Sequence, residues 1–112
     1  MGARTDPPAG ALKRRFTLQR PVATADGAGG ETIGWETVAA LWGRLEWLAG
    51  EEQVEAARPQ QSVRYRVLTR WRAGTDAGQR LVLGTRIFDV RAVADPDGDR
   101  RRLLWLVEEV MP

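Results

Sequence analysis

Residues 62–71 alternate between apolar and arginine side chains, and this alternation limits the possible folds more than any other feature of the sequence. Val63, Tyr65, Val67, Thr69 and Trp71 would share one face of a strand, and Arg64, Arg66, Leu68 and Arg70 the other. A period of two residues is typical of a β-strand with one face in a core and one in water. We therefore predict a strand here, as part of a sheet that buries a single face.

Other segments show similar patterns and are separated by turn-forming residues. We predict further strands over residues 12–20, 80–83, 86–94 and 102–110. Gly84-Thr85 fits a two-residue hairpin turn with glycine first. Residues 24–34 are rich in glycine and predict a loop, and DPDGD at 95–99 predicts a turn. Together these elements predict an all-β chain, a β-barrel of about six antiparallel strands.

Two central segments carry less decisive patterns. Residues 35–49 fit either a helical face or a strand face, and Gly43 together with three tryptophans favours a strand. In residues 50–58, Gly50 stands at a capping position, two glutamates follow in the first turn and Arg58 lies in the last. This arrangement predicts one short α-helix.

The domain organisation is simple. Residues 1–11 are rich in Pro, Gly and Ala and predict a flexible N-terminal arm. The remaining residues, 12–112, are of the size of one domain, and we expect them to form the barrel.

The chain contains neither cysteine nor histidine. This excludes disulfides, thiolate metal sites, cysteine nucleophiles and histidine-dependent triads. Asp95, Asp97 and Asp99 lack the glycine and glutamate spacing of a calcium loop. We therefore expect no enzyme activity, no catalytic residue, no metal and no cofactor.

Charge is arranged in blocks. Seventeen basic and fifteen acidic residues leave a net charge of +2, yet residues 21–57 carry one arginine and seven acids, and residues 58–91 carry eight arginines and two acids. Such blocks suit docking on other copies or on partners through complementary patches, and an ordinary mixed surface is the alternative. The arginines of 64–70 could also bind single-stranded nucleic acid beside aromatic rings. They fall on the opposite strand face from Tyr65 and Trp71, which argues against that use.

The order of the segments resembles a known protein family. The opening strand RRFTLQRPV at 14–22 leads through the glycine-rich loop to Trp35 and an Ala-Leu-Trp run at 40–42. A Leu-Ala-Gly-Glu-Glu segment at 48–52, RYRV at 64–67 and RLVLGTRIFDV at 80–90 follow. This ordered set resembles the phage head–tail joining family, the small head-closure or stopper proteins in the necks of tailed phages and gene transfer agents.

The resemblance implies a structural, non-enzymatic barrel protein in a ring of six or twelve subunits. Such a ring lies below the portal or adaptor ring and above a tail terminator or tail tube, and double-stranded DNA passes through its channel. In some members the segment after the second strand closes the channel, which maps onto residues 48–61. The candidate channel or gate residues are Gly50, Glu51, Glu52, Gln53, Val54, Glu55, Ala56 and Ala57.

The chemistry of this segment suits a channel, because acidic and neutral side chains repel or ignore DNA phosphates whereas an arginine ring binds them. The alternative is a solvated segment used for docking. Candidate contacts with a neighbouring subunit or partner are Arg58, Arg64, Arg66, Arg70 and Trp35.

The sequence also indicates where the protein is located and which other functions remain as alternatives. The first residues lack the apolar stretch of a signal peptide, and no run approaches the roughly 18 apolar residues of a membrane helix. We expect assembly in the bacterial cytoplasm and then residence in the particle neck, without a membrane. The alternatives are an adaptor or tail-completion protein of the same neck, and a small β-barrel that binds single-stranded nucleic acid.

Overall fold

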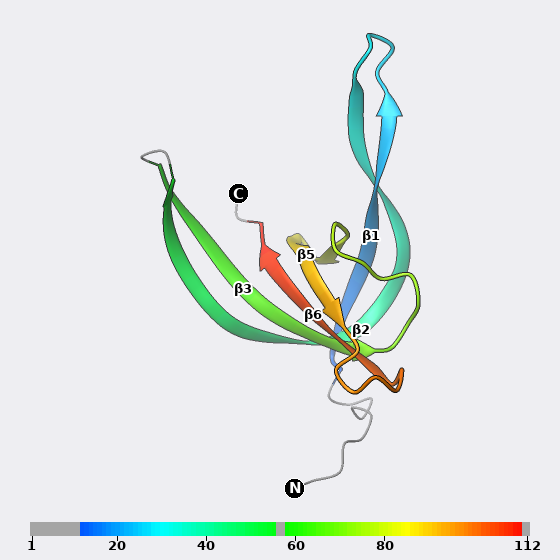
Figure 1. The fold of residues 1–112 in the computed structure, drawn as a ribbon, viewed down its shortest axis with the longest axis vertical. Helices are drawn as coiled ribbons and strands as arrows, with labels where there is room; N and C mark the ends of the chain where they lie inside the picture. Colours follow the sequence, from blue (N-terminus) through cyan, green and yellow to red (C-terminus); the bar gives the residue numbers. More distant parts are fainter. Residues whose placement is uncertain (1–11, 56–57, 111–112) are drawn as a thin grey trace, which may run out of the picture.

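The computed structural model describes residues 12–55 and 58–110, with the backbone alone over 49–62. In this part of the chain every regular element is a strand, and all strand pairs are antiparallel. The strands are β1 (Arg14–Ala25), β2 (Glu31–Glu55), β3 (Arg58–Arg70), β4 (Arg80–Leu83), β5 (Arg86–Ala94) and β6 (Arg102–Glu109). They close into a barrel in the order β1-β2-β3-β6-β5-β4 (Figure 1). The predicted six-stranded all-β barrel is therefore confirmed.

The short helix expected over residues 50–58 is wrong. Residues 50–55 continue β2, with Gly50 opposite Val63 and Glu55 opposite Arg58 in β3. An isolated helix of this length is marginal in water, since about 12 or more residues are needed. Here the barrel has already brought β2 and β3 together, so each further pair only lengthens an existing ladder. Ala56 and Ala57 lie outside the described residues.

The ambiguous segment 35–49 is also strand, because it belongs to the 25-residue β2. Irregularities in the register interrupt β2 twice, once opposite Leu18 and Gln19 of β1 and once between Trp47 and Ala49. An extra residue of this kind bends a strand and increases its twist. The bends allow one long strand to pair with β1 along its first half and with β3 along its second half.

The barrel interior holds the hydrophobic core. Its buried side chains are Phe16, Leu18, Val67, Leu81, Phe88, Val90, Leu103, Trp105 and Val107. On β3, Val67 and Thr69 are fully buried while Arg64 and Arg70 are exposed, so the alternation predicted for 62–71 is confirmed. Gly43 is buried against Phe16 and Val67, where β2 crosses the core closely.

Both predicted tight turns are present. Gly84 has a φ of +63° between β4 and β5, which glycine adopts without the steric cost that a Cβ atom brings. In the turn between β5 and β6, the Asp95 carboxylate accepts hydrogen bonds from the backbone nitrogens of Gly98 and Arg100 at 3.0 and 2.9 Å. This carboxylate satisfies backbone donors that the turn leaves without a strand partner.

Two long hairpins project beyond the closed part of the barrel, one made by β1 and β2 and the other by β2 and β3 (Figure 1). β4 pairs with β1 only at Thr17–Gln19, and β6 pairs with β3 only from Val63 onward. Beyond those points each hairpin consists of two strands alone. The expected N-terminal arm, residues 1–11, lies outside the described residues. A search of the described part found no helix of the length and hydrophobicity needed to cross a membrane.

Candidate interaction surfaces

The residues expected to contact a subunit or partner do not form one site. Arg64 and Arg70 are exposed on the outer face of β3, and Trp35 lies on the β1–β2 hairpin. Arg66 is half-buried and its guanidinium binds the carboxylate of Glu46 on β2. Arg58 belongs to the part of β3 whose side chains are outside the described set, at the tip of the other hairpin.

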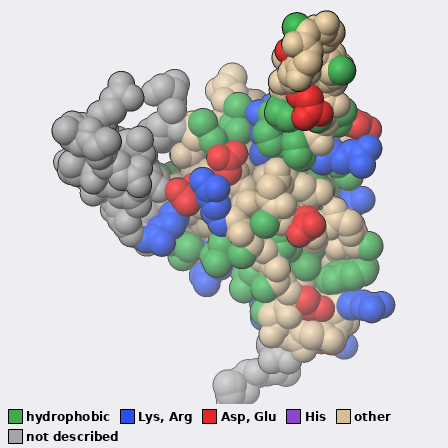
Figure 2. Space-filling view, turned by 45° about the horizontal axis from the view of Figure 1, so that its top comes forward, with side chains coloured by type: hydrophobic (Ala, Val, Ile, Leu, Met, Phe, Trp, Pro, Cys, Tyr) green, Lys and Arg blue, Asp and Glu red, His purple; other side chains and the backbone are tan. Residues whose placement is uncertain are grey.

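The distal part of the β1–β2 hairpin, residues 20–36, forms a two-stranded ribbon that we call the β1–β2 ribbon. Figure 2 shows it as a knob that stands clear of the body. Pro21 pairs with Trp35 and Ala23 with Ile33. Residues that face each other across two strands share a face, as do residues two apart on one strand. These four side chains therefore make one face of the ribbon apolar up to its loop end, where the Ala25–Glu31 pair lies on the same face.

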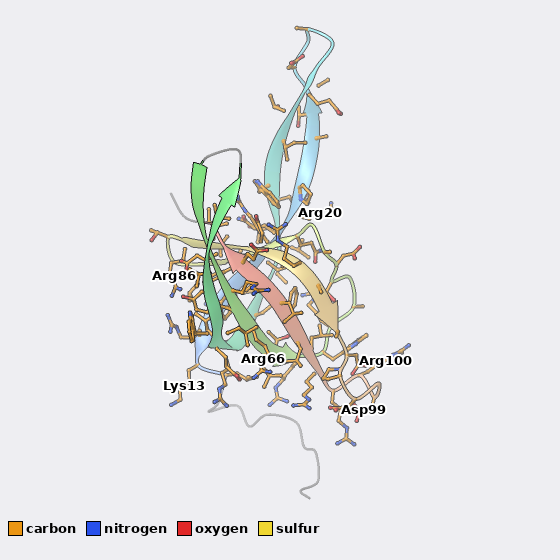
Figure 3. The ribbon with its side chains drawn as sticks, turned by 60° about the vertical axis from the view of Figure 1, so that its left-hand side comes forward. Lys13, Arg20, Arg66, Arg86, Asp99 and Arg100 are labelled. Atoms are coloured by element: carbon orange, nitrogen blue, oxygen red, sulfur yellow. The ribbon has the colours of Figure 1, made fainter. Side chains whose placement is uncertain are left out.

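The opposite face of the ribbon carries two polar pairs on either side of Val22 and Gly34. Arg20 and Glu36 form an exposed ion pair with an Nη2–Oε2 distance of 3.2 Å. The Thr32 hydroxyl donates to the backbone oxygen of Thr24 at 3.4 Å. Figure 3 shows Arg20 where the ribbon leaves the barrel. The ribbon is thus amphipathic across its two faces.

The loop and the base of the ribbon are held by specific contacts. At the loop, the Asp26 carboxylate accepts hydrogen bonds from the backbone nitrogens of Ala28 and Gly30, and these bonds lower the pKa of Asp26. At the base, the guanidinium of Arg80 lies 4.2 Å from the centre of the Trp35 ring. The Nε of Arg80 also donates to the Gln19 side chain at 2.7 Å. Trp35 is therefore held in place from the barrel side.

A groove of about 420 Å³ lies on the outer surface beside β6, at the base of the β2–β3 hairpin. We call it the β6 groove, and it is lined by Leu48, Arg64, Tyr65, Arg91, Leu106, Val107 and Glu108. Leu48 and Leu106 are 41% and 46% exposed. The Nε of Arg91 donates to the Glu108 carboxylate at 3.0 Å. The groove combines an apolar floor with two arginines and one carboxylate.

A second pocket, of about 510 Å³, lies at the end of the barrel where β1 begins. Leu12, Ala40, Leu41, Trp42, Thr69, Arg70, Trp71 and Arg72 line it. The Arg100 guanidinium lies 5.5 Å from the centre of the Trp71 ring. Figure 3 shows Lys13, Asp99 and Arg100 at this end, away from the β1–β2 ribbon. The pocket is apolar inside with cationic side chains beside it.

An ion pair near the other end of the barrel serves stability. The Nε and Nη2 atoms of Arg86 donate to the Glu109 carboxylate at 2.8 and 3.0 Å, and Nη2 also donates to the Tyr65 hydroxyl at 3.1 Å. The hydrogen bonds that Arg86 donates to Glu109 lower the pKa of Glu109 and raise the pKa of Arg86. These contacts join β3, β5 and β6, and we therefore interpret the ion pair as a structural feature of the barrel and not as a binding site.

Of the predicted channel residues, those from Gly50 to Glu55 lie in the distal part of β2, within the β2–β3 hairpin. The ladder runs from Gly50 opposite Val63, where β3 makes its last contact with β6, to Glu55 opposite Arg58, and the pairs from Glu51–Ser62 outward lie beyond that contact. Glu51, Glu52 and Glu55 all belong to this segment. The gate candidates that the structure describes therefore lie together on one projecting strand segment, in a different hairpin from Trp35.

Several exposed apolar side chains are not among the residues proposed from the sequence. Ile33, Trp42, Trp47 and Leu106 are all exposed. The concentration of three tryptophans within residues 35–47 was the available signal, since tryptophan is enriched at protein interfaces. Alternation alone shows which residues share a face, and it does not show whether that face is covered.

Comparison with known proteins gives a consistent result. The phage head completion protein family matches residues 7–110. A chain of the virion of the native gene transfer agent (GTA) particle matches with a TM-score of 0.75 and 28% identity, over 90% of this chain and 97% of that one. A protein from Shigella flexneri 2a, solved in solution, matches with a TM-score of 0.65 and 25% identity, over 89% and 94%. No curated protein matches the chain.

Proposed function

This chain belongs to the phage head completion protein family and is a structural protein of a phage or phage-like particle, and we propose that it closes the DNA-filled head as a stopper. In this role it forms a ring of six or twelve subunits between the portal or adaptor and the tail. The ring retains packaged DNA and offers the surface on which the tail docks. The match to a chain of a gene transfer agent virion supports a place in such a particle.

The observation that carries the stopper role is the projecting β2–β3 hairpin. Its distal pairs, from Glu51–Ser62 to Glu55–Arg58, lie beyond the closed barrel, so the hairpin can reach a channel while the barrel holds the ring. Three glutamates in residues 50–57 disfavour binding of DNA phosphates. A gate of this composition blocks DNA by its bulk and lets it slide when the gate opens.

Contacts between subunits complete the proposal. Arg64, Arg70 and Trp35 have exposed side chains on different parts of the surface, as neighbours in a ring require. Arg66 is already engaged by Glu46, so its role is to hold β2 against β3 within one subunit. Arg58 would pair with an acidic residue of the neighbouring hairpin tip.

The first experiment is electron microscopy of particles from a host strain that lacks this gene. We expect separate tails and heads that have lost DNA. Intact tailed particles with retained DNA would show that the chain does not close the head. In that case, the next experiment would measure how strongly the purified chain binds single-stranded oligonucleotides at several salt concentrations.

A shortened hairpin tests the gate itself. Replacing residues 52–61 with Asn-Gly keeps the Glu51–Ser62 pair as the last of the ladder and supplies a two-residue turn. We expect this variant to enter particles and to leak DNA. The purified variant should keep the unfolding midpoint of the native chain, because the core is unchanged. Full DNA retention in assembled particles would leave the segment a docking element instead of a gate.

A further inference from the structure

The apolar face of the β1–β2 ribbon is left uncovered. Ile33 is 60% exposed, and Trp35, although held by Arg80, is still 36% exposed. Within the described residues, β1 has no partner other than β2 beyond Gln19. Two-stranded hairpins are at best marginally stable on their own, and an exposed apolar face with open edges favours association.

The ribbon is already shaped for a partner. The Asp26 carboxylate fixes its loop, the Arg20–Glu36 pair bridges its polar face, and Arg80 positions Trp35 at its base. A preformed element loses less conformational entropy on binding than a flexible one. The ribbon therefore has the properties of a docking element, and its apolar face is the part that would be buried.

The β6 groove offers a matching surface. Its exposed Leu48 and Leu106 give apolar contact area, and Arg64 and Arg91 stand beside Glu108. Residues 20–36 carry one arginine and three acids, a net charge of −2, whereas two arginines and one acid line the groove, with Asp89 at 3.8 Å from Arg91 beside it. Both surfaces offer apolar contact area, and the arginines of the groove can pair with the acidic side chains of the ribbon.

We propose that the apolar face of the β1–β2 ribbon of one copy lies in the β6 groove of the next copy around the ring. The ribbon and the base of the β2–β3 hairpin lie on different parts of the molecule (Figure 1), so the contact joins two unlike surfaces. Contacts between unlike surfaces repeat from copy to copy and close into a ring when the rotation allows it. The proposal rests on the ring assembly proposed above and names the surfaces that build it.

Chemical crosslinking in assembled particles tests this contact, and the absence of native cysteines makes it clean. Particles would be assembled with a chain that carries Ile33→Cys and Leu106→Cys and treated with a short bis-maleimide. We expect a ladder of covalent multimers of this chain up to the full ring. The matched control carries Thr32→Cys with Leu106→Cys, because Thr32 lies on the polar face of the ribbon next to Ile33.

The proposal is tested by comparing the multimer yield of the Ile33→Cys pair with that of the control pair. Equal multimer yields from the two pairs, or none from either in assembled particles, would overturn the contact. A crosslink from Ile33→Cys alone to a different particle protein would show that this protein covers the ribbon, and would also overturn it. In each of these cases the neck role is judged separately: if heads of the gene-deletion strain lose DNA, the proposed neck function holds even though this contact is wrong.

A charge exchange covers the case in which the cysteine variants do not enter particles. Ile33→Arg would place a cation against the groove arginines, and Leu106→Asp would place an acid against the acidic ribbon. We expect each change alone to reduce the yield of tailed, DNA-filled particles and the two together to restore part of it. Both side chains are exposed, so the purified variants should keep the native unfolding midpoint. Single variants with normal particle yields, or a double variant without recovery, would contradict the proposal.

Discussion

The indole nitrogen of Trp105 donates a 2.9 Å hydrogen bond to the hydroxyl oxygen of Thr69, and both side chains are buried inside the barrel. The Thr69 hydroxyl in turn donates to the backbone oxygen of Arg70 at 2.9 Å. This chain of bonds joins β6 to β3 and satisfies the one polar atom of the largest core side chain. A buried indole without such a partner would lower the free energy of unfolding.

Replacing Thr69 with valine should therefore destabilise the barrel. Thr69→Val keeps the shape of the side chain but leaves the Trp105 N–H without its acceptor, at an expected loss of about 1–3 kcal/mol. Urea unfolding of the purified chain measures the loss. Thr37→Val is the matched control, since Thr37 is exposed on β2 and should change stability by about 0.5 kcal/mol or less. Equal effects of the two changes would mean that the buried bond contributes nothing.

We predict that replacing Gly43 with even the smallest side chain, that of alanine, destabilises the barrel. A Cβ atom there would lie 3.1 Å from Phe16 Cε1, 3.1 Å from Val67 Cγ1 and 3.2 Å from the Leu68 backbone oxygen. Crowding in a packed core typically costs about 1–3 kcal/mol, so Gly43→Ala should lower the unfolding midpoint. Gly34→Ala serves as the control, because the nearest atom to its Cβ, the Val22 backbone oxygen, is 3.9 Å away.

The strands were predictable where one face is buried and the other is not. The alternation around Val67 and Thr69 identified β3 and its inner face, because burial of one face imposes a period of two. The helix predicted over residues 50–58 was wrong because it was inferred from local signals alone. Its capping and charge signals are local and weak, and pairing with β3 supplies a full ladder of backbone hydrogen bonds that no local pattern reveals.

The surfaces were less predictable than the strands. The sequence pointed to Trp35 and Arg64 as contact residues, and their side chains are exposed. It gave no indication that Arg66 is engaged by Glu46, since cross-strand partners depend on a register that only the assembled barrel defines. The exposure of Ile33 was equally hidden, because β1 and β2 extend past their neighbours by lengths that the sequence does not show.

Stability in acid should depend on Glu109. Its pKa is lowered by the hydrogen bond from Arg86, so its contribution is fully present above the pKa of an unfolded glutamate and is lost as the pH falls through the folded value. Glu109→Gln should cost about 0.5–1 kcal/mol at pH 7, because the pair is partly exposed.

Unfolding measured between pH 7 and about pH 3, across the ordinary glutamate range, checks this dependence. The difference between native chain and Glu109→Gln should shrink as the pH falls. Glu36→Gln removes one half of the exposed Arg20 pair and serves as the control, with a smaller effect throughout. A difference that stays constant with pH would show that the ionisation of Glu109 does not matter.

Arg80 is predicted to control the order of the β1–β2 ribbon. Its guanidinium packs on the Trp35 ring at 4.2 Å and is tied to Gln19, and a cation–π contact at such a site contributes about 0.5–1 kcal/mol. Arg80→Gln should therefore speed hydrogen–deuterium exchange of the backbone amides of residues 20–36 about two- to fivefold, the equivalent of that energy, while β6 amides stay protected. Arg101→Gln, at the opposite end of the barrel, should leave ribbon exchange unchanged. If both variants exchange alike in residues 20–36, the β1–β2 pairing alone orders the ribbon and Trp35 needs no support from the barrel.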